Sequence, residues 1–346
     1  LESPLYLTHF VTNKCNLECR HCFYHNFLNK EIKTPGFGEI EKMIKSLKRP
    51  LERVVITGGE PFLYPNLASL CLAYKKINKA KQIFLDTNGY TTGLIAETVN
   101  NIAAEIDSPL HIQLSLDGPP SVHNFIRGKE NAFKKLSETV KVLKDLRKVY
   151  PNLKIHALIV ISSLNHSRIE ETFETAEKLG VDYGFELVRI AGISSRGKAI
   201  KTDYKPKDAA CTLPEDGELS SLILKIKKFS KERNQKSENF LFSLYIYEEA
   251  LKALRENGKH KRCLAAGTSA IVYPDMEVSI CEMKNSLGNL SDYDFNLPRL
   301  LEEKAKTESF CCRCTHGCTL MLEVQYNILK NFKIFALSRA ADFKKK

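Results

Sequence analysis

The run Cys15-Asn16-Leu17-Glu18-Cys19-Arg20-His21-Cys22 decides the fold, because it places three cysteines in the spacing C-x3-C-x2-C. Three thiolates on one short loop can bind three of the four irons of a [4Fe–4S] cluster. The fourth iron then has no protein ligand and can bind a substrate or cofactor, as an open zinc site does. The loop follows an apolar run over 5–12 that is typical of a strand. The sequence therefore predicts a catalytic iron–sulfur loop after an N-terminal strand.

Beyond this loop, strand-like and helix-like segments alternate along the chain. Repeated βα units imply a parallel sheet with right-handed crossovers. We therefore expect an α/β fold, a partial (β/α)6 TIM-like barrel, with its chemistry at the carboxyl ends of the strands. The expected strands are 5–12, 53–57, 82–87, 111–117, 154–161 and 183–190, and the expected helices are 40–47, 67–78, 94–104, 133–149 and 169–179.

Three further motifs follow the second, third and fourth of these strands. Glycines after a strand let the backbone approach a ligand closely, and a carboxylate there can accept hydrogen bonds from an amino group. In this order, and together with the cysteine spacing, the motifs resemble those of the radical SAM superfamily. They are Gly58-Gly59-Glu60-Pro61, Thr87-Asn88-Gly89, and Ser115-x-Asp117-Gly118 with His123 and Arg127 after it.

The resemblance implies that the open iron binds S-adenosylmethionine (SAM), which is cleaved reductively to a 5′-deoxyadenosyl radical that abstracts a substrate hydrogen. The implied cluster ligands and catalytic residues are Cys15, Cys19 and Cys22. Glu60 would bind the amino group of SAM, Arg127 its carboxylate, and Ser115 and Asp117 its ribose. The full set of implied cofactor-binding residues is His21, Gly58, Gly59, Glu60, Asn88, Ser115, Asp117, Arg127 and Asn165.

A second cysteine-rich segment covers 263–320. Cys263 precedes an expected hairpin that ends at Cys281, and Gly288-Asn289 follows. This order resembles the auxiliary-cluster domains called SPASM and twitch, which usually have glycine in the hairpin turn. Met276 takes that place here, and we expect Asp275 to adopt the unusual dihedral angle.

The resemblance implies one auxiliary [4Fe–4S] cluster, because the five candidate ligands are fewer than the seven of a full SPASM domain. Four cysteine ligands would leave no open iron, so the cluster would relay an electron from a substrate radical. A structural zinc site is the alternative. The preferred ligands are Cys263, Cys281, Cys311 and Cys314, with Cys318 as a close substitute and Cys312 as a bystander.

Four regions are expected: the barrel over 1–200, a helical linker over 201–262, the auxiliary domain over 263–320, and an amphipathic basic helix over 321–346. Packing on the barrel is the favoured interpretation of this last helix, and peripheral contact with a membrane surface is the alternative. No apolar run approaches the roughly 18 residues of a membrane span.

Composition narrows the classes of protein. The net charge is +11, from 52 Lys and Arg against 41 Asp and Glu, but basic residues stand beside Glu on helical segments such as 41–45. Solvated helix faces explain most of this charge, so no nucleic-acid partner is expected. Tight cysteine clusters without a signal peptide favour metal binding in a reducing, cytoplasmic setting.

The sequence thus predicts a radical SAM oxidoreductase or maturase that receives electrons from a small flavodoxin- or ferredoxin-type protein. Net oxidation or cross-linking of a peptide is the first expectation. Oxidation, or C–C or C–S bond formation, on a small molecule or lipid is the alternative. More distant alternatives are a zinc-bound nucleic-acid-binding protein, which would bind in a salt-dependent way, and an iron–sulfur electron carrier, which would not need Glu60 or Asp117.

Overall fold

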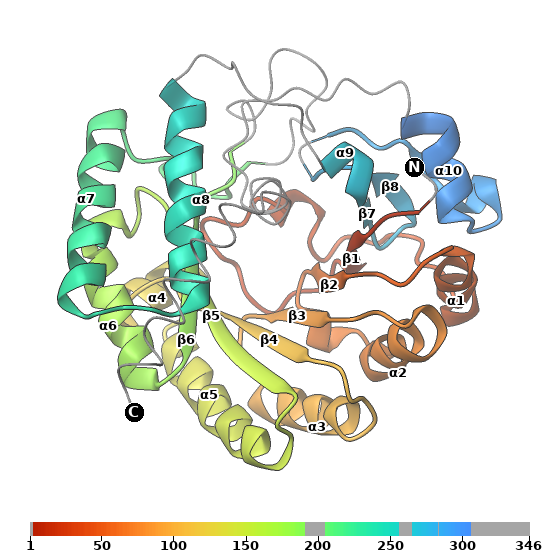
Figure 1. Ribbon diagram of the computed structural model, residues 1–346, viewed down its shortest axis with the longest axis horizontal. Coiled ribbons are helices and arrows are strands. Elements are labelled where there is room, and N and C mark those ends of the chain that lie inside the picture. The colour runs from red at the N-terminus through yellow and green to blue at the C-terminus, as the bar shows by residue number, and fades with distance from the viewer. Residues whose placement is uncertain (1–2, 191–204, 256–264, 283, 306–346) are drawn as a thin grey trace.

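The computed structural model describes residues 3–190, 205–255, 265–282 and 284–305, and one nine-stranded sheet runs through them in the order β6-β5-β4-β3-β2-β1-β7-β8-β9. Strands β1 to β6 form a six-stranded parallel part, β7 adds to it parallel to β1, and β8 pairs antiparallel with both β7 and β9. The six-stranded parallel part confirms the partial barrel, whose sheet is not closed (Figure 1). The strands are β1 (Tyr6–Thr12), β2 (Arg53–Gly58), β3 (Ile83–Thr87), β4 (Leu110–Ser115), β5 (Leu153–Ile161), β6 (Asp182–Leu187), β7 (Ser269–Val272), β8 (Glu277–Ser279) and β9 (Gly288–Asn289).

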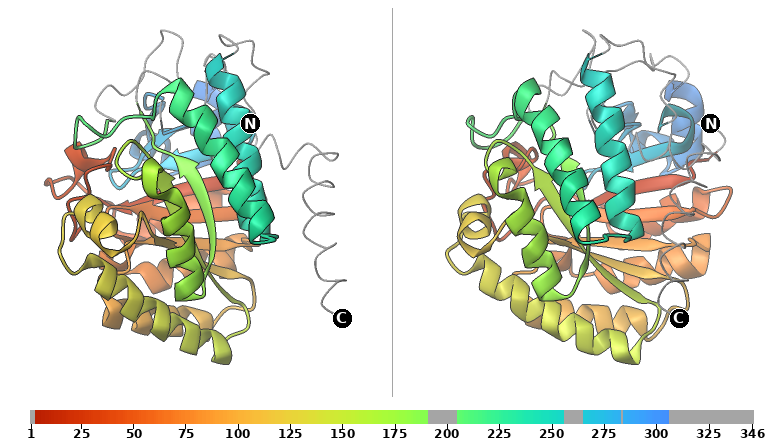
Figure 2. Two further views of the ribbon diagram at one scale, coloured as in Figure 1. Left: turned by 90° about the vertical axis from the view of Figure 1, so that its left-hand side faces the viewer. Right: turned by 60° about the vertical axis from the view of Figure 1, so that its left-hand side comes forward.

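Helices cover the outer face of the curved sheet (Figures 1 and 2). Alternate strand residues point to these helices and form the core, as Val54 and Ile56 do in β2, while Val55 and Thr57 face the barrel interior. The connecting helices are α1 (Phe37–Ser46), α2 (Leu67–Ala73), α3 (Thr92–Ala103), α4 (Pro120–Arg127), α5 (Ala132–Val149) and α6 (Ile169–Leu179), and α10 (Leu297–Lys304) follows β9.

Helix α4 has no counterpart in the expected elements. Pro120 stands in its first turn and Gly128 ends it in the left-handed conformation, with φ of 69°. Its buried face includes His123 and Arg127 as well as Ile126. Since two of these three residues are polar, the apolar period that marks a helix is missing from the sequence.

The helices α7 (Asp216–Glu232) and α8 (Glu238–Arg255) lie in the segment expected as a linker, and both contribute to the barrel's hydrophobic core. Helix α8 lies along the edge strand β6, where the Phe185 amide donates a hydrogen bond of 2.8 Å to Ser243 Oγ. The contact protects one edge of the open sheet. The division of the chain into four regions stays a prediction.

The hairpin of β7 and β8 extends the barrel's own sheet, because β7 pairs with β1. Met276 in the turn has φ of 68°, so Met276 itself adopts the left-handed conformation. The expectation that Asp275 would adopt it was wrong. The Met276 side chain is 3% exposed, and its burial holds the backbone in a conformation that costs a non-glycine residue about 1–2 kcal/mol.

Met276→Gly is expected to lower the free energy of unfolding by about 1–3 kcal/mol. Losing the buried methionine side chain costs about 2–5 kcal/mol, which outweighs the about 1–2 kcal/mol regained because glycine adopts the left-handed conformation without strain. Denaturant unfolding measures the change. Asp294→Gly is the matched control, since Asp294 also has a positive φ, of 49°, but an exposed side chain. The control should be neutral or stabilising. A Met276→Gly protein at least as stable as the wild type would contradict this explanation.

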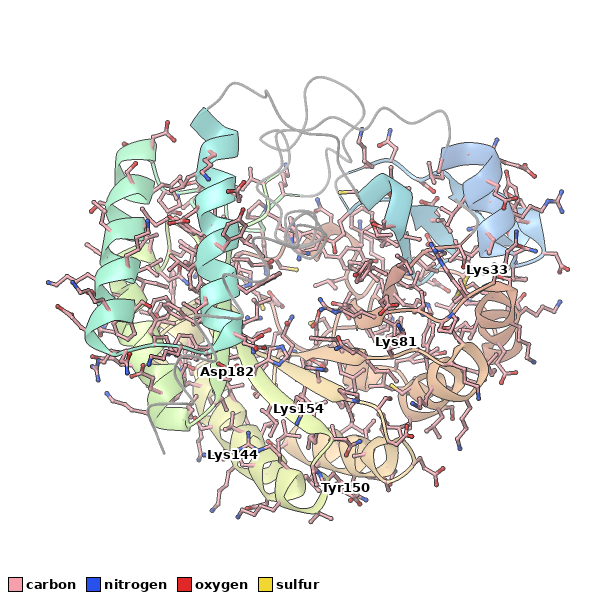
Figure 3. The ribbon with its side chains drawn as sticks, viewed as in Figure 1. Lys33, Lys81, Lys144, Tyr150, Lys154 and Asp182 are labelled. Atoms are coloured by element: carbon pink, nitrogen blue, oxygen red, sulfur yellow. The ribbon has the colours of Figure 1, made fainter. Side chains whose placement is uncertain are left out.

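Charged side chains are dispersed over the molecule. The labelled lysines Lys33, Lys81, Lys144 and Lys154 lie apart from one another (Figure 3). Some are paired, as Lys81 is with Glu52 at 2.6 Å. Within the described ranges, no helix is both long enough and apolar enough to cross a membrane.

Candidate active site

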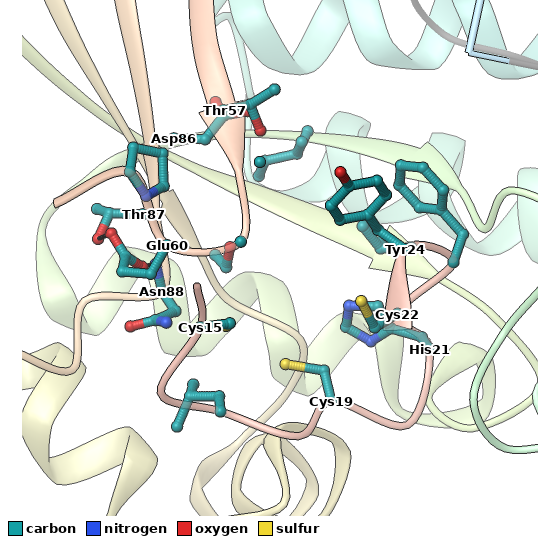
Figure 4. A pocket seen from close by; sticks show the side chains of 18 of the residues that line it. Cys15, Cys19, His21, Cys22, Tyr24, Thr57, Glu60, Asp86, Thr87 and Asn88 are labelled. Carbon is teal, nitrogen blue, oxygen red and sulfur yellow. Dashed lines mark hydrogen bonds between the residues drawn. The ribbon is translucent and has the colours of Figure 1, made fainter. Parts of the chain in front are cut away.

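One cavity lies at the carboxyl ends of strands β2 to β6, where a parallel barrel is expected to hold its chemistry (Figure 4). The cysteine loop that follows β1 forms one side, and none of its three cysteines is in a disulfide. Asp117 and Asn165 do not line this cavity. The sequence-predicted residues that do are Cys15, Cys19, His21, Cys22, Gly58, Gly59, Glu60, Asn88, Ser115 and Arg127.

The glycine pair joins β2 to the cysteine loop. The Gly59 amide donates to the Thr12 carbonyl and the Glu60 amide to the Lys14 carbonyl, both at 2.8 Å. A Cβ on Gly59 would lie 2.1 Å from the Lys14 carbonyl oxygen, and one on Gly58 would lie 2.4 Å from that of Thr12. Close approach was expected toward a ligand, but the nearest neighbour of each glycine is protein backbone. The pair therefore fixes where the cysteine loop begins.

Glu60 is fully buried from bulk solvent, and its carboxylate is held by three donors. Oε1 accepts from Thr87 Oγ1 at 2.9 Å and from the Phe62 amide at 3.2 Å, and Oε2 accepts from the Asn88 amide at 2.8 Å. Burial raises the pKa of Glu60 to about 7, although these hydrogen bonds oppose the shift. The carboxyl group is thus fixed in orientation and titrates near neutral pH.

Asparagine side chains fix the cysteine loop itself. Asn88 Nδ2 donates to Asn16 Oδ1 at 2.8 Å, which ties the end of β3 to the loop. Asn29 accepts from the Cys15 amide and donates to the Cys15 carbonyl, and Asn13 donates to the carbonyls of Phe27 and Lys30. Sequence analysis selected Asn88 but missed the supporting residues Asn13, Asn16 and Asn29. Their signal was an asparagine-rich stretch around the cysteines, since asparagine readily binds nearby backbone groups.

Asp117 and Arg127 form a buried ion pair behind Cys19. Arg127 Nε lies 2.5 Å from Asp117 Oδ2, and Arg127 Nη1 donates to Cys19 Sγ at 3.5 Å. Burial alone would raise the pKa of Asp117, but the Arg127 guanidinium holds it below its usual value. Asn165 lies behind this pair and donates to the carbonyls of Asp117 and Val160. Contacts of Asp117 and Asn165 with SAM stay predictions.

Polar side chains lie beside apolar ones on the wall of the cavity inside the barrel. Gln113 Nε2 donates to Asp86 Oδ1 at 2.9 Å, and Arg189 lies 3.4 Å from Glu186 and 2.5 Å from Glu282. Sequence analysis did not select these residues. The signal for Asp86, Gln113 and Glu186 was present, because each occupies an alternate position of its strand (β3, β4 or β6) that faces the interior.

Asp86→Asn should change the pH dependence of thermal stability. Burial raises the pKa of Asp86 from 3.8 to about 7. Between these values the unfolded chain has released a proton that the folded protein keeps, so the stability contributed by Asp86 is lost as pH rises toward 7. The melting temperature at about pH 8 minus that at about pH 5 should therefore be more positive in the variant than in the wild type. Equal differences would contradict the assignment.

Glu282, the residue after Cys281, connects the auxiliary segment to a residue of the cavity wall. Cys281 follows β8, where Ser279 Oγ donates to its carbonyl at 2.7 Å, and the next residue is Glu282, which pairs with Arg189 on the cavity wall. Outside the described residues lie the other candidate ligands Cys263, Cys311, Cys314 and Cys318, the expected bystander Cys312, and the helix expected over 321–346. The twitch-like domain stays a prediction.

The sequence of this chain is similar to those of a known family and of several known proteins. Residues 10–176 match the radical SAM superfamily. The antilisterial bacteriocin subtilosin biosynthesis protein AlbA of Bacillus subtilis is 31% identical over 147 residues, which are 41% of this chain and 31% of AlbA. A GTP 3′,8-cyclase of Helicobacter pylori is 27% identical over 175 residues, 50% of this chain and 52% of the cyclase. The chain thus spans about a third and about half of these two relatives.

Solved structures share the fold. The structure of anSMEcpe with bound AdoMet superposes with a TM-score of 0.61 at 19% identity, and covers 88% of this chain and 83% of that one. Streptococcus suis SuiB bound to its precursor peptide SuiA superposes with a TM-score of 0.59 at 17% identity, and covers 93% of this chain and 73% of SuiB.

Proposed function

We propose that this chain is a radical SAM enzyme, as the match of residues 10–176 to that superfamily indicates, and that it binds a [4Fe–4S] cluster through Cys15, Cys19 and Cys22 with SAM beside it. The observation that carries the proposal is the shared cavity, in which the three cysteines lie around the same space as Glu60 and Asn88 (Figure 4).

The donor set fits this cluster. No three His, Cys, Asp or Glu side chains in the described parts of the chain converge closely enough to hold a single metal ion. A cubane cluster does not require such convergence, because each cysteine binds its own iron. Three free thiols on one anchored loop suit a cluster with one open iron.

The residues around the cluster would orient SAM. The Glu60 carboxylate, fixed by Thr87 and Asn88, would accept hydrogen bonds from the amino group of SAM. Ser115 at the end of β4 would bind the ribose, and His21 would contact the adenine. When bound, the cluster and SAM supply the one-electron chemistry that removes a hydrogen atom from the substrate.

We infer a peptide substrate, modified by net oxidation or cross-linking. AlbA takes part in bacteriocin biosynthesis and SuiB binds a precursor peptide, which supports this substrate class. The polar side chains Asp86, Gln113 and Arg189 on the cavity wall would offer hydrogen-bond partners for peptide groups. An auxiliary cluster at Cys281 would accept the electron that an oxidation releases, and a flavodoxin-type protein would supply the first electron. The similarity to GTP 3′,8-cyclase favours a second candidate, a nucleotide substrate.

Substrate-dependent SAM cleavage separates the two candidates. The anaerobically reconstituted full chain, with SAM and dithionite, is given short peptides encoded beside its gene or GTP, and 5′-deoxyadenosine is quantified. We expect a peptide to accelerate the reaction and to lose the mass of two hydrogens, and GTP to have no effect. Acceleration by GTP alone would replace the peptide with a nucleotide.

A further inference from the structure

A buried pair of opposite charges lies directly against one of the three loop cysteines. Arg127 Nη1 donates to Cys19 Sγ at 3.5 Å, and Arg127 Nε lies 2.5 Å from Asp117 Oδ2. Arg127 is 6% exposed and Asp117 is 0% exposed. The two residues were expected to bind the carboxylate and ribose of SAM, yet both charges are also close enough to act on the sulfur.

The end of helix α4 is fixed to the cysteine loop, so this contact is not a chance side-chain rotamer. The Arg20 amide donates to the Ile126 carbonyl at 2.8 Å. Gly128, which ends α4 with a positive φ, packs so tightly that a Cβ would lie 2.9 Å from the Glu18 carbonyl oxygen. Both contacts hold the Arg127 backbone against the loop between Cys15 and Cys22.

Asp117 is equally constrained. Its amide donates to His123 Nδ1 at 3.3 Å, and its carbonyl accepts from Asn165 Nδ2 at 2.9 Å. Among the described residues its carboxyl oxygens have no hydrogen-bond partner, and the ion pair with Arg127 is their charge contact. With little water nearby, both charges act on Cys19 with little screening.

We propose that Arg127 and Asp117 are positioning residues that set the reduction potential of the cluster held by Cys19. This inference rests on the proposed function. A reduced cluster carries one more negative charge than an oxidised one, so a guanidinium that donates to a ligand sulfur stabilises the reduced form and raises the potential. The Asp117 carboxylate opposes this effect. The added electron comes from the external reductant, dithionite or a flavodoxin-type protein.

The two residues should therefore shift the potential in opposite directions. Potentials are measured by titration followed by electron paramagnetic resonance on the reconstituted full chain without SAM. At the wild-type midpoint, Arg127→Gln should lower the ratio of reduced to oxidised cluster about tenfold, a shift of about 59 mV for a one-electron couple, and Asp117→Asn should raise the ratio. Lys129→Gln, which removes an exposed charge near the same helix end, should leave it unchanged because solvent screens that site.

Arg127→Lys keeps the charge but not the planar donor. The reduction potential of its cluster should therefore lie between those of the wild type and Arg127→Gln. It also provides a measurement if Arg127→Gln does not fold. Iron content and SAM affinity are measured on every sample. Unchanged potentials in iron-loaded Arg127→Lys and Asp117→Asn, or shifts in the same direction, would overturn the inference. Unchanged potentials with weakened SAM binding would instead assign Arg127 to the SAM carboxylate alone. A wild-type protein that holds no cluster would refute the proposed function itself.

Discussion

Gly59→Ala should weaken cluster retention about 10- to 100-fold, the range seen when residues that orient metal ligands are changed. The new Cβ would lie 2.1 Å from the Lys14 carbonyl oxygen and 2.6 Å from its carbon. Because both are backbone atoms, the cysteine loop or the end of β2 must move. That movement breaks the bonds from Gly59 to Thr12 and from Glu60 to Lys14, next to Cys15. Iron and sulfide per chain after anaerobic reconstitution measure the loss.

Gly93→Ala is the matched control for this substitution. Gly93 lies in the first turn of α3, and a Cβ there would meet nothing within 4 Å. Alanine should leave the iron content unchanged and add up to about 1 kcal/mol of helix stability. A Gly59→Ala protein with wild-type iron content would show that the glycine contact does not position the loop.

Glu60→Gln should weaken SAM binding about 10- to 100-fold while the cluster remains. The carboxylate accepts from Thr87, Asn88 and Phe62, and a glutamine NH₂ group would face at least one of these donors. A buried donor left without an acceptor costs about 1–3 kcal/mol, and the charge-assisted bond to the SAM amino group is lost as well. Anaerobic calorimetry of SAM binding to the reconstituted protein measures the change.

Glu97→Gln on the exposed surface of α3 removes the same charge without touching the cavity, and should bind SAM as the wild type does. Equal SAM affinity in iron-loaded Glu60→Gln and wild-type proteins would refute the assignment of Glu60 to the amino group.

Spacing and periodicity predicted the barrel because they depend on which residues share a face or an end of the sheet. The motifs at Gly58, Asn88 and Ser115 each follow a parallel strand, and the structure brings all three to one cavity. Periodicity could not show which polar side chains already have hydrogen-bond partners inside the protein. Asn165 looked available for a ligand, but backbone carbonyls of β5 and Asp117 already accept from its amide.

Tertiary packing of buried residues explains the larger differences between the predicted and the observed fold. Helix α4 was not expected because Arg127 and His123 occupy its buried face, and their burial depends on Asp117 and on the cysteine loop. The positive φ is expected at Asp275 but occurs at Met276, because packing in the core outweighs the local cost. In each case a tertiary contact overrides a local preference.

Formation of 5′-deoxyadenosine tests the central claim most directly. The full chain and its Cys15→Ala/Cys19→Ala/Cys22→Ala variant are reconstituted with iron and sulfide without oxygen, and each is given SAM and dithionite with the peptide substrate. We predict 5′-deoxyadenosine from the wild type and none from the variant. Equal product from both proteins, or an iron-loaded wild type that binds SAM and releases none, would contradict the account.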